Sequence, residues 1–171
     1  MRDVEFRGKI CIDGHYGPTG RWTEREWVYG SLVHQTDFYG DKVDRYYIID
    51  GTNTQDYDIG PEYRVLEETV GQYVGREDKT GRKIYEGDIL KGKHYPFCYD
   101  GEYNYYGEVC WFDEEAQFGI WVYKRPGTDV VGRSTGNMIG LDVWESELWE
   151  VIGNVHDNPE LTFEGGKNDS E

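Results

Sequence analysis

The chain has 171 residues, which allows one domain or two small ones, and a chain of this length can hold a core without a metal or a disulfide. It carries 18 Lys and Arg against 34 Asp and Glu, so its formal net charge is −16. A field this negative repels DNA, RNA and anionic lipid. It suits a cationic partner, or it simply keeps a small protein soluble.

The first half of the chain reads as short strands separated by polar loops. β-branched and aromatic runs at 3–9, 26–32 and 46–50 alternate with turn clusters, and no window shows apolar residues at helical spacing. The segment 37–44 reads as a polar turn, and 11–25 reads as an insertion rich in Gly and Pro. Segment 63–69 is ambiguous between a strand and one helical turn; Val65 and Thr69 favour the strand.

The stretch from Thr69 to Leu90 organises the chain, with two turns and two strand starts in quick succession. Asp78-Lys79-Thr80-Gly81 has Asp and Gly where a turn needs a side-chain acceptor and a permissive backbone. Lys83-Ile84-Tyr85 is a short extended piece, Glu86-Gly87-Asp88 turns again, and a strand begins at Asp88. We place a boundary between two units near Arg76.

The second half is predicted to be a small SH3-like barrel, over residues 77–161. Its strands are expected at 88–93, 105–112, 117–123 and 149–155, with a short helix at 142–148. Phe118, Ile120 and Val122 alternate with polar and large aromatic residues and should face the core. The segments 92–104 and 124–137 read as loops or insertions, and the tail 162–171 is small and polar and should be disordered.

Several motifs in this order and spacing carry a resemblance to a known family. They are Phe6-Arg7-Gly8-Lys9, the segment 26–32, Thr69-Val70-Gly71-Gln72-Tyr73, the segment 83–89, Tyr106-Gly107-Glu108-Val109 and the segment 151–161. In these residues the chain resembles the YopX family of phage and prophage proteins. The resemblance implies a mostly β protein from a phage or prophage, and it brings no established biochemical activity. The expected architecture is a smaller N-terminal β unit, residues 1–76, followed by the barrel.

Secretion, membrane insertion and disulfide bonding are not expected. The N-terminal residues lack the apolar core of a secretory signal, and no stretch approaches about 18 consecutive apolar residues. Cys11, Cys98 and Cys110 are widely spaced and form no Cys-x-x-Cys pair, which argues against a zinc site or a thioredoxin-type motif. We therefore expect reduced thiols in a protein of the host cytoplasm.

Catalytic, cofactor and metal motifs are not found. His15, His34, His94 and His156 lie in no nucleophile or metal-spacing motif, and no phosphate-binding glycine loop occurs. Glu86 and Asp88 could form a carboxylate pair, but turn stabilisation by Asp88 is the favoured interpretation. The acidic runs 56–58 and 113–115 lack the ligand spacing of an EF-hand. We expect no enzyme, no cofactor and no metal.

Aromatic side chains are the remaining candidates for a binding site. Trp121 and Tyr123 fall on the strand face opposite the aliphatic set, and Tyr105 and Tyr106 lie near the mouth of the same hairpin. They could bind a partner protein or stack on single-stranded nucleic acid, or they could pack against the rest of the chain.

The predicted function is non-enzymatic binding to a host or phage protein, or self-association. Three alternatives remain: an acidic mimic of nucleic acid, direct nucleic-acid binding through the barrel, and a hydrolase using Glu86 and Asp88.

Overall fold

The computed structural model describes residues 4–11, 26–37, 43–51, 62–92, 105–123, 138–140 and 148–162. These residues are mostly β, as expected, and they form two antiparallel sheets. None of the helices in these ranges has the length or apolar character needed to cross a membrane. The chain divides into two compact units, Met1–Tyr73 and Val74–Glu171, so the division falls in the same strand as Arg76, where the sequence suggested a boundary.

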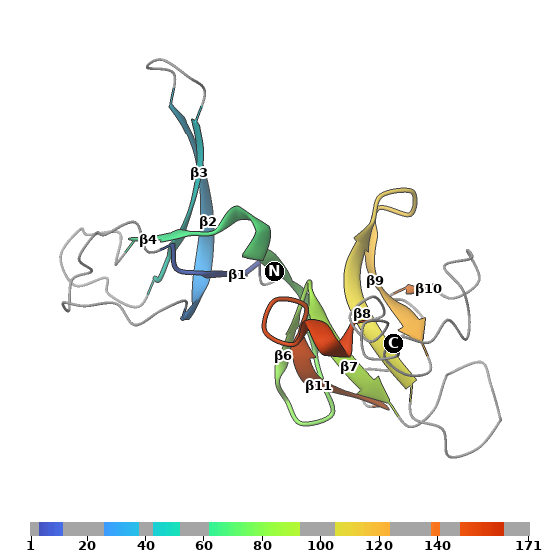
Figure 1. Cartoon of the computed structure of the whole chain (residues 1–171). Coiled ribbons are helices and arrows are strands. Elements are labelled where there is room, and N and C mark those ends of the chain that lie inside the picture. Colours follow the sequence, from blue (N-terminus) through green and yellow to red (C-terminus); the bar gives the residue numbers. More distant parts are fainter. Residues whose placement is uncertain are drawn as a thin grey trace, which may run out of the picture. The chain divides into compact units, whose positions relative to one another are not determined.

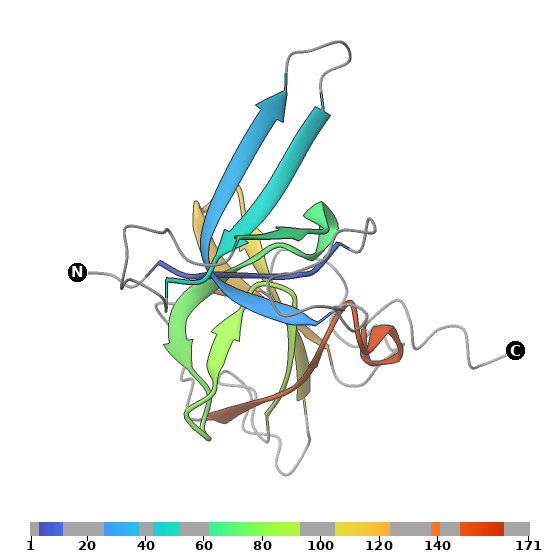
Figure 2. The ribbon, with the colours of Figure 1, turned by 90° about the vertical axis from the view of Figure 1, so that its left-hand side faces the viewer.

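The first unit consists of antiparallel strands in the order β4-β3-β2-β1, and one isolated bridge also links the segment after β1 to β4. Strand β2 pairs with β1 through its first residues and with β3 from Ser31 onward, and β3 pairs with β4. Ile10, just after β1, bridges to Val65 at the end of β4. The long β2–β3 hairpin is plain in both views of the ribbon (Figures 1 and 2). The elements are β1 (Phe6–Lys9), β2 (Trp27–Asp37), β3 (Val43–Ile49), β4 (Glu62–Val65) and the 3₁₀ turn η1 (Glu67–Thr69).

Two glycines permit close backbone packing in this unit. Gly30 has a φ of 154°, and a Cβ there would overlap the carbonyl oxygen of Ile49 and lie 2.8 Å from its carbonyl carbon. A Cβ at Gly8 would lie 2.9 Å from the Cβ of Val65. Only glycine fits Gly30 without a shift of the backbone, at the point where β2 changes its strand partner.

The second unit contains a five-stranded antiparallel sheet in the order β10-β9-β8-β7-β11. Its longest ladder is the β8–β9 hairpin, with seven residue pairs from Tyr106↔Tyr123 to Phe112↔Gln117. The SH3-like barrel expected here stays a prediction. The elements are β5 (Gly71–Glu77), which enters this unit from the first, β6 (Lys83–Tyr85), β7 (Asp88–Gly92), β8 (Tyr105–Phe112), β9 (Gln117–Tyr123), β10 (Met138–Gly140), β11 (Trp149–Asn154) and the 3₁₀ turn η3 (Pro159–Leu161).

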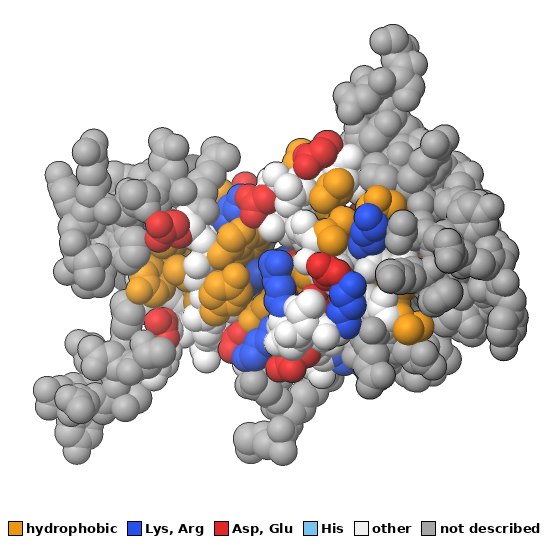
Figure 3. Space-filling view, turned by 90° about the horizontal axis from the view of Figure 1, so that it is seen from below, with side chains coloured by type: hydrophobic (Ala, Val, Ile, Leu, Met, Phe, Trp, Pro, Cys, Tyr) orange, Lys and Arg blue, Asp and Glu red, His pale blue; other side chains and the backbone are white. Residues whose placement is uncertain are grey.

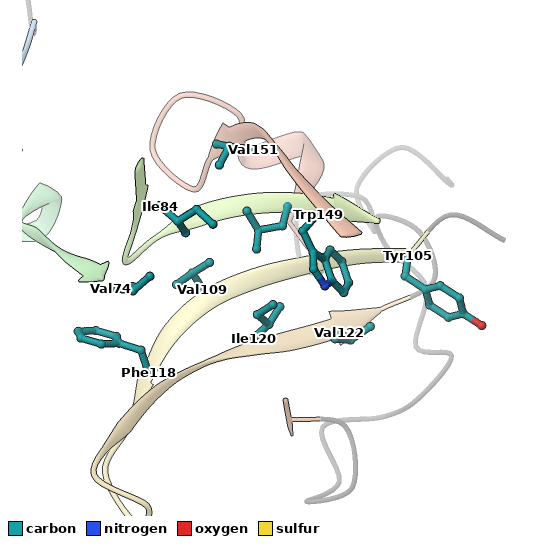
Figure 4. Packing of buried hydrophobic residues seen from close by; sticks show 10 residues of the cluster. Val74, Ile84, Tyr105, Val109, Phe118, Ile120, Val122, Trp149 and Val151 are labelled. Carbon is teal, nitrogen blue, oxygen red and sulfur yellow. The ribbon is translucent and has the colours of Figure 1, made fainter. Parts of the chain in front are cut away.

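One apolar cluster fills the inner side of this sheet (Figure 4). Trp149 is fully buried. Its ring packs so closely on Gly92 that a Cβ at Gly92 would lie 2.9 Å from ring atom Cε3. The predicted core residues Phe118, Ile120 and Val122 are all buried, as expected, and Gly119 and Tyr123 of the same strand are buried as well. The cluster consists of Val74, Ile84, Leu90, Tyr105, Val109, Phe118, Ile120, Val122, Trp149 and Val151.

Two buried carboxylates fix the turns of the organising stretch. Asp78 Oδ1 accepts hydrogen bonds from Thr80 N, Thr80 Oγ1 and Arg82 N at 2.7, 2.6 and 3.0 Å, and its Oδ2 accepts one from Val151 N at 2.9 Å. Burial raises the pKa of Asp78, but these hydrogen bonds outweigh it and leave the pKa below its ordinary value. Asp88, fully buried, accepts a hydrogen bond from Tyr85 N at 2.9 Å.

Some element boundaries differ from those expected. The segment 63–69 holds both the end of β4 and the turn η1, so the preference for strand throughout was wrong. The expected polar turn at 37–44 is shorter, because β2 continues to Asp37 and β3 begins at Val43. Strand β10 was not predicted. The expected helix at 142–148 lies outside the described residues apart from Leu148, as do most of the three insertions and nearly all of the tail.

Candidate protein-binding site

The carboxylate pair considered for hydrolysis does not form an open site. Asp88 is fully buried and holds the backbone of the turn, and Gly87 between the two acids has a φ of 78°. A general base must reach a substrate proton, and a buried turn acceptor cannot. The geometry therefore supports the turn role of Asp88 that the sequence favoured.

The thiol of Cys110 is also a poor nucleophile. Burial raises its pKa to about 12, and the charges of Glu108 and Glu86 add to this effect. A thiol with so high a pKa carries almost no thiolate at neutral pH. Among the described residues, moreover, no three His, Cys, Asp or Glu side chains are grouped in a way that could hold a metal ion.

His34 takes part in a polar row across the β2–β3 hairpin. Its Nε2 lies 3.1 Å from Asp44 Oδ1, and its ring stacks on Tyr46 with centroids 4.6 Å apart. A hydrogen bond with Glu67 raises the pKa of Tyr46, and burial and the charges of Glu67 and Asp44 act in the same direction. The Thr36 hydroxyl donates to Asp44 at 2.7 Å rather than to His34. A nucleophile hydrogen-bonded to its base is thus not formed, and the row reads as cross-strand stabilisation.

The outer face of the second sheet carries three of the four aromatic residues that the sequence singled out. We use "outer face" for Tyr106 and Trp121 with their neighbours Lys91, Glu108 and Tyr123. The rings of Tyr106 and Tyr123 stack with centroids 6.0 Å apart, and Lys91 Nζ lies 5.6 Å from the Tyr106 centroid. Glu108 is paired with Trp121 in the β8–β9 ladder. Tyr106 and Trp121 are half-buried, and each presents part of its ring to solvent.

Tyr105 and Tyr123 are not the outward aromatic residues that we expected. Tyr105 belongs to the apolar cluster, on the opposite face of β8 from Tyr106. Tyr123 does lie on the outer face, but it is buried, and its hydroxyl donates a hydrogen bond to Leu161 O at 2.7 Å. Burial raises the pKa of its hydroxyl, helped by the charge of Glu108. Tyr123 thus packs against Tyr106 and is itself too buried to be a contact surface.

Trp111 is an exposed aromatic residue that the sequence reasoning missed. Alternation places it on the same face of β8 as the buried Val109, but it lies near the end of the strand and is exposed. It is 42% exposed, and its ring meets Phe118 edge-on, with centroids 5.0 Å apart at 73°. Proximity to the turn at 113–116 is the one sequence signal that could have revealed it.

Charges of both signs are mixed on the described surface. In the face shown in Figure 3, Lys and Arg side chains lie among Asp and Glu. Lys79 and Glu150 form an ion pair across neighbouring segments of the second unit. A mimic of nucleic acid needs carboxylates in rows at phosphate-like spacing, and this face does not show such a row.

Comparison with known families gives one assignment. The family model described as YopX protein matches residues 22–162, which is most of the chain and includes both units. Comparison with curated proteins gives no significant match.

Proposed function

The chain belongs to the YopX family, and from this premise we propose that it is a phage- or prophage-encoded binding protein without enzymatic activity. It acts inside the host cell and contacts a host or phage protein. The proposal rests on one observation: Trp121 and Tyr106 are partly exposed on the rigid β8–β9 ladder.

The physical reason is the way the Tyr106 ring is held. Tyr106 is backed by the buried ring of Tyr123, which is anchored to Leu161 O. Side chains fixed in this way lose little further rotamer freedom when a partner binds. Large aromatic residues on rigid strands are the residues that most often dominate the energy of a protein interface.

The test is a pull-down from host lysate with the tagged full-length chain. We expect one partner in stoichiometric amount, retained at high salt because the interface is aromatic rather than ionic. The double variant Trp121→Ala/Tyr106→Ala should lose at least about tenfold in affinity, as truncation of interface anchors does.

The matched control is Tyr29→Ala, which removes an exposed aromatic ring from the first unit. It should retain the partner, and thermal unfolding of each variant shows that the fold is intact. Undiminished capture by the double variant, or equal loss in the control, would refute the assignment of the outer face. Recovery of the chain's own copies alone would instead indicate self-association.

A further inference from the structure

All the charged side chains of the β8–β9 hairpin are acidic, whereas the surface described above carries charges of both signs. Residues 105–123 contain four carboxylates and no Lys or Arg. Three of these, Asp113, Glu114 and Glu115, lie in the exposed turn between the strands, and Glu108 lies on the outer face. Because the whole chain has a net charge of −16, both the nearby carboxylates and the chain's overall charge make the electrostatic field at this turn negative.

Trp111 lies beside this turn and is the most exposed tryptophan among the described residues. Trp27 and Trp121 are half-buried, and Trp149 is fully buried. Phe118 holds the Trp111 ring from one side, so its orientation is set before any partner arrives. We define the "hairpin tip" as Trp111 together with the turn 113–116.

A backbone hydrogen bond crosses the turn. Ala116 has a φ of 50°, and its N–H donates to Asp113 O across the turn at 3.4 Å. The flanking pair Phe112↔Gln117 closes the ladder directly beneath it. The tip thus places a partly exposed indole within four residues of three exposed carboxylates.

We propose that the hairpin tip binds a basic segment of a partner protein through Lys or Arg side chains. A cation is attracted to the face of an indole, and neighbouring carboxylates strengthen this attraction and supply hydrogen-bond acceptors for a guanidinium or ammonium group. An acidic partner, a nucleic acid or an anionic membrane would meet repulsion at the same place. The inference names the chemistry of the partner and rests on the proposed binding function.

The test uses the full-length chain and a fluorescently labelled peptide of alternating Arg and Gly. A peptide in which Gln replaces every Arg is the matched ligand control. We expect the Arg peptide to bind, with an affinity that falls as salt rises, and the Gln peptide not to bind. Absence of binding by the Arg peptide at low salt overturns the inference.

Two variants test whether the peptide binds at the hairpin tip, and one matched control tests the effect of the chain's overall negative charge. Trp111→Leu and Glu114→Gln/Glu115→Gln should each weaken the Arg peptide by at least roughly fivefold. Glu62→Gln/Glu160→Gln removes the same charge from two exposed positions that are not part of the tip and should change the affinity by less than about twofold. Equal losses in the two double variants would show that only the overall charge matters, and would refute the inference.

Fluorine NMR of the chain labelled with 5-fluorotryptophan gives a second readout in the native protein. The resonance that disappears in Trp111→Phe identifies Trp111, and it should shift on titration with the Arg peptide. Shifts confined to other tryptophans would contradict the inference even where Trp111→Leu is destabilised. The binding function itself is tested by capture through Trp121 and Tyr106, so failure of the hairpin tip and failure of the binding function give different results.

Discussion

The two units differ in the interactions that stabilise each of them. The second unit buries a continuous apolar cluster, and its two buried carboxylates serve backbone groups at turns. In the first unit, the buried side chains include Arg7 and Lys9 as well as apolar residues such as Ile48 and Val65. The guanidinium of Arg7 lies 4.6 Å and the ammonium of Lys9 5.3 Å from the Trp27 ring centroid.

This difference indicates where each unit obtains its stability. In the second unit the removal of apolar surface from water is the main favourable term. In the first, the charged ends of Arg7 and Lys9 lie over the Trp27 indole ring, and glycine allows close contacts of the main chain. We therefore expect substitutions of large apolar residues to be most costly in the second unit, and substitutions of glycine to dominate in the first.

The largest expected effect is at the centre of the apolar cluster. Trp149→Ala leaves a cavity the size of an indole and should lower the free energy of unfolding by about 3–5 kcal/mol. Urea denaturation followed by circular dichroism measures the loss. Trp111→Ala, which truncates the exposed tryptophan of the same unit, should cost no more than about 1 kcal/mol.

Trp149→Phe separates filling of the core from hydrogen bonding. The indole Nε1 of Trp149 is buried and has no hydrogen-bond partner within the described structure. Replacing it by a carbon ring removes an unsatisfied donor, which offsets part of the lost volume. Trp149→Phe should thus lower the free energy of unfolding clearly less than Trp149→Ala. Similar losses in the two variants would indicate that the indole N–H matters more than packing.

The next largest effect is expected at a glycine of the first unit. Gly30→Ala should cost about 2–3 kcal/mol, because the new methyl group overlaps the carbonyl of Ile49 and the φ of 154° disfavours a side chain. Hydrogen exchange of the β2 and β3 amides measures this locally. Gly51→Ala is the matched control: a Cβ there meets nothing within 4 Å, and its effect should stay within about 0.5 kcal/mol. Equal effects at both positions would remove the special role of Gly30.

Strand alternation and turn chemistry were the parts of the fold that could be predicted from the sequence. Alternation along 117–123 identified Phe118, Ile120 and Val122 as core, and Asp with a Gly in the same turn identified the turns at Asp78 and Asp88. Both signals are local, since each depends on the backbone geometry of a few neighbouring residues.

The candidate site was harder to predict because exposure depends on distant segments. Alternation correctly placed Tyr123 on the outer face, but it could not show that Leu161 meets its hydroxyl. Alternation likewise placed Trp111 on the same face as Val109 without showing that Trp111 is exposed. Which face a residue occupies is a local property, whereas what covers that face is set by tertiary contacts many residues away.

The last destabilising substitution concerns the carboxylate that ties the first turn of the second unit to β11. Asp78→Asn keeps the acceptor for Thr80 and Arg82 but replaces Oδ2 by an NH₂ group facing the N–H of Val151. Loss of this charge-assisted bond should cost about 1.5–3 kcal/mol at neutral pH. Urea denaturation of both proteins across the acidic range measures it.

The pH dependence of that cost distinguishes the carboxylate from mere side-chain volume. Because the folded-state pKa of Asp78 is lowered, its contribution is fully present above the unfolded value of about 3.9 and is lost as pH falls through the folded value. The difference between wild type and Asp78→Asn should therefore shrink steadily below about pH 4. Asp113→Asn, at an exposed turn position, should stay within about 0.5 kcal/mol of wild type. A cost at Asp78 that persists unchanged in acid would mean that the backbone bonds do not require the charge, and that packing alone joins the turn to β11.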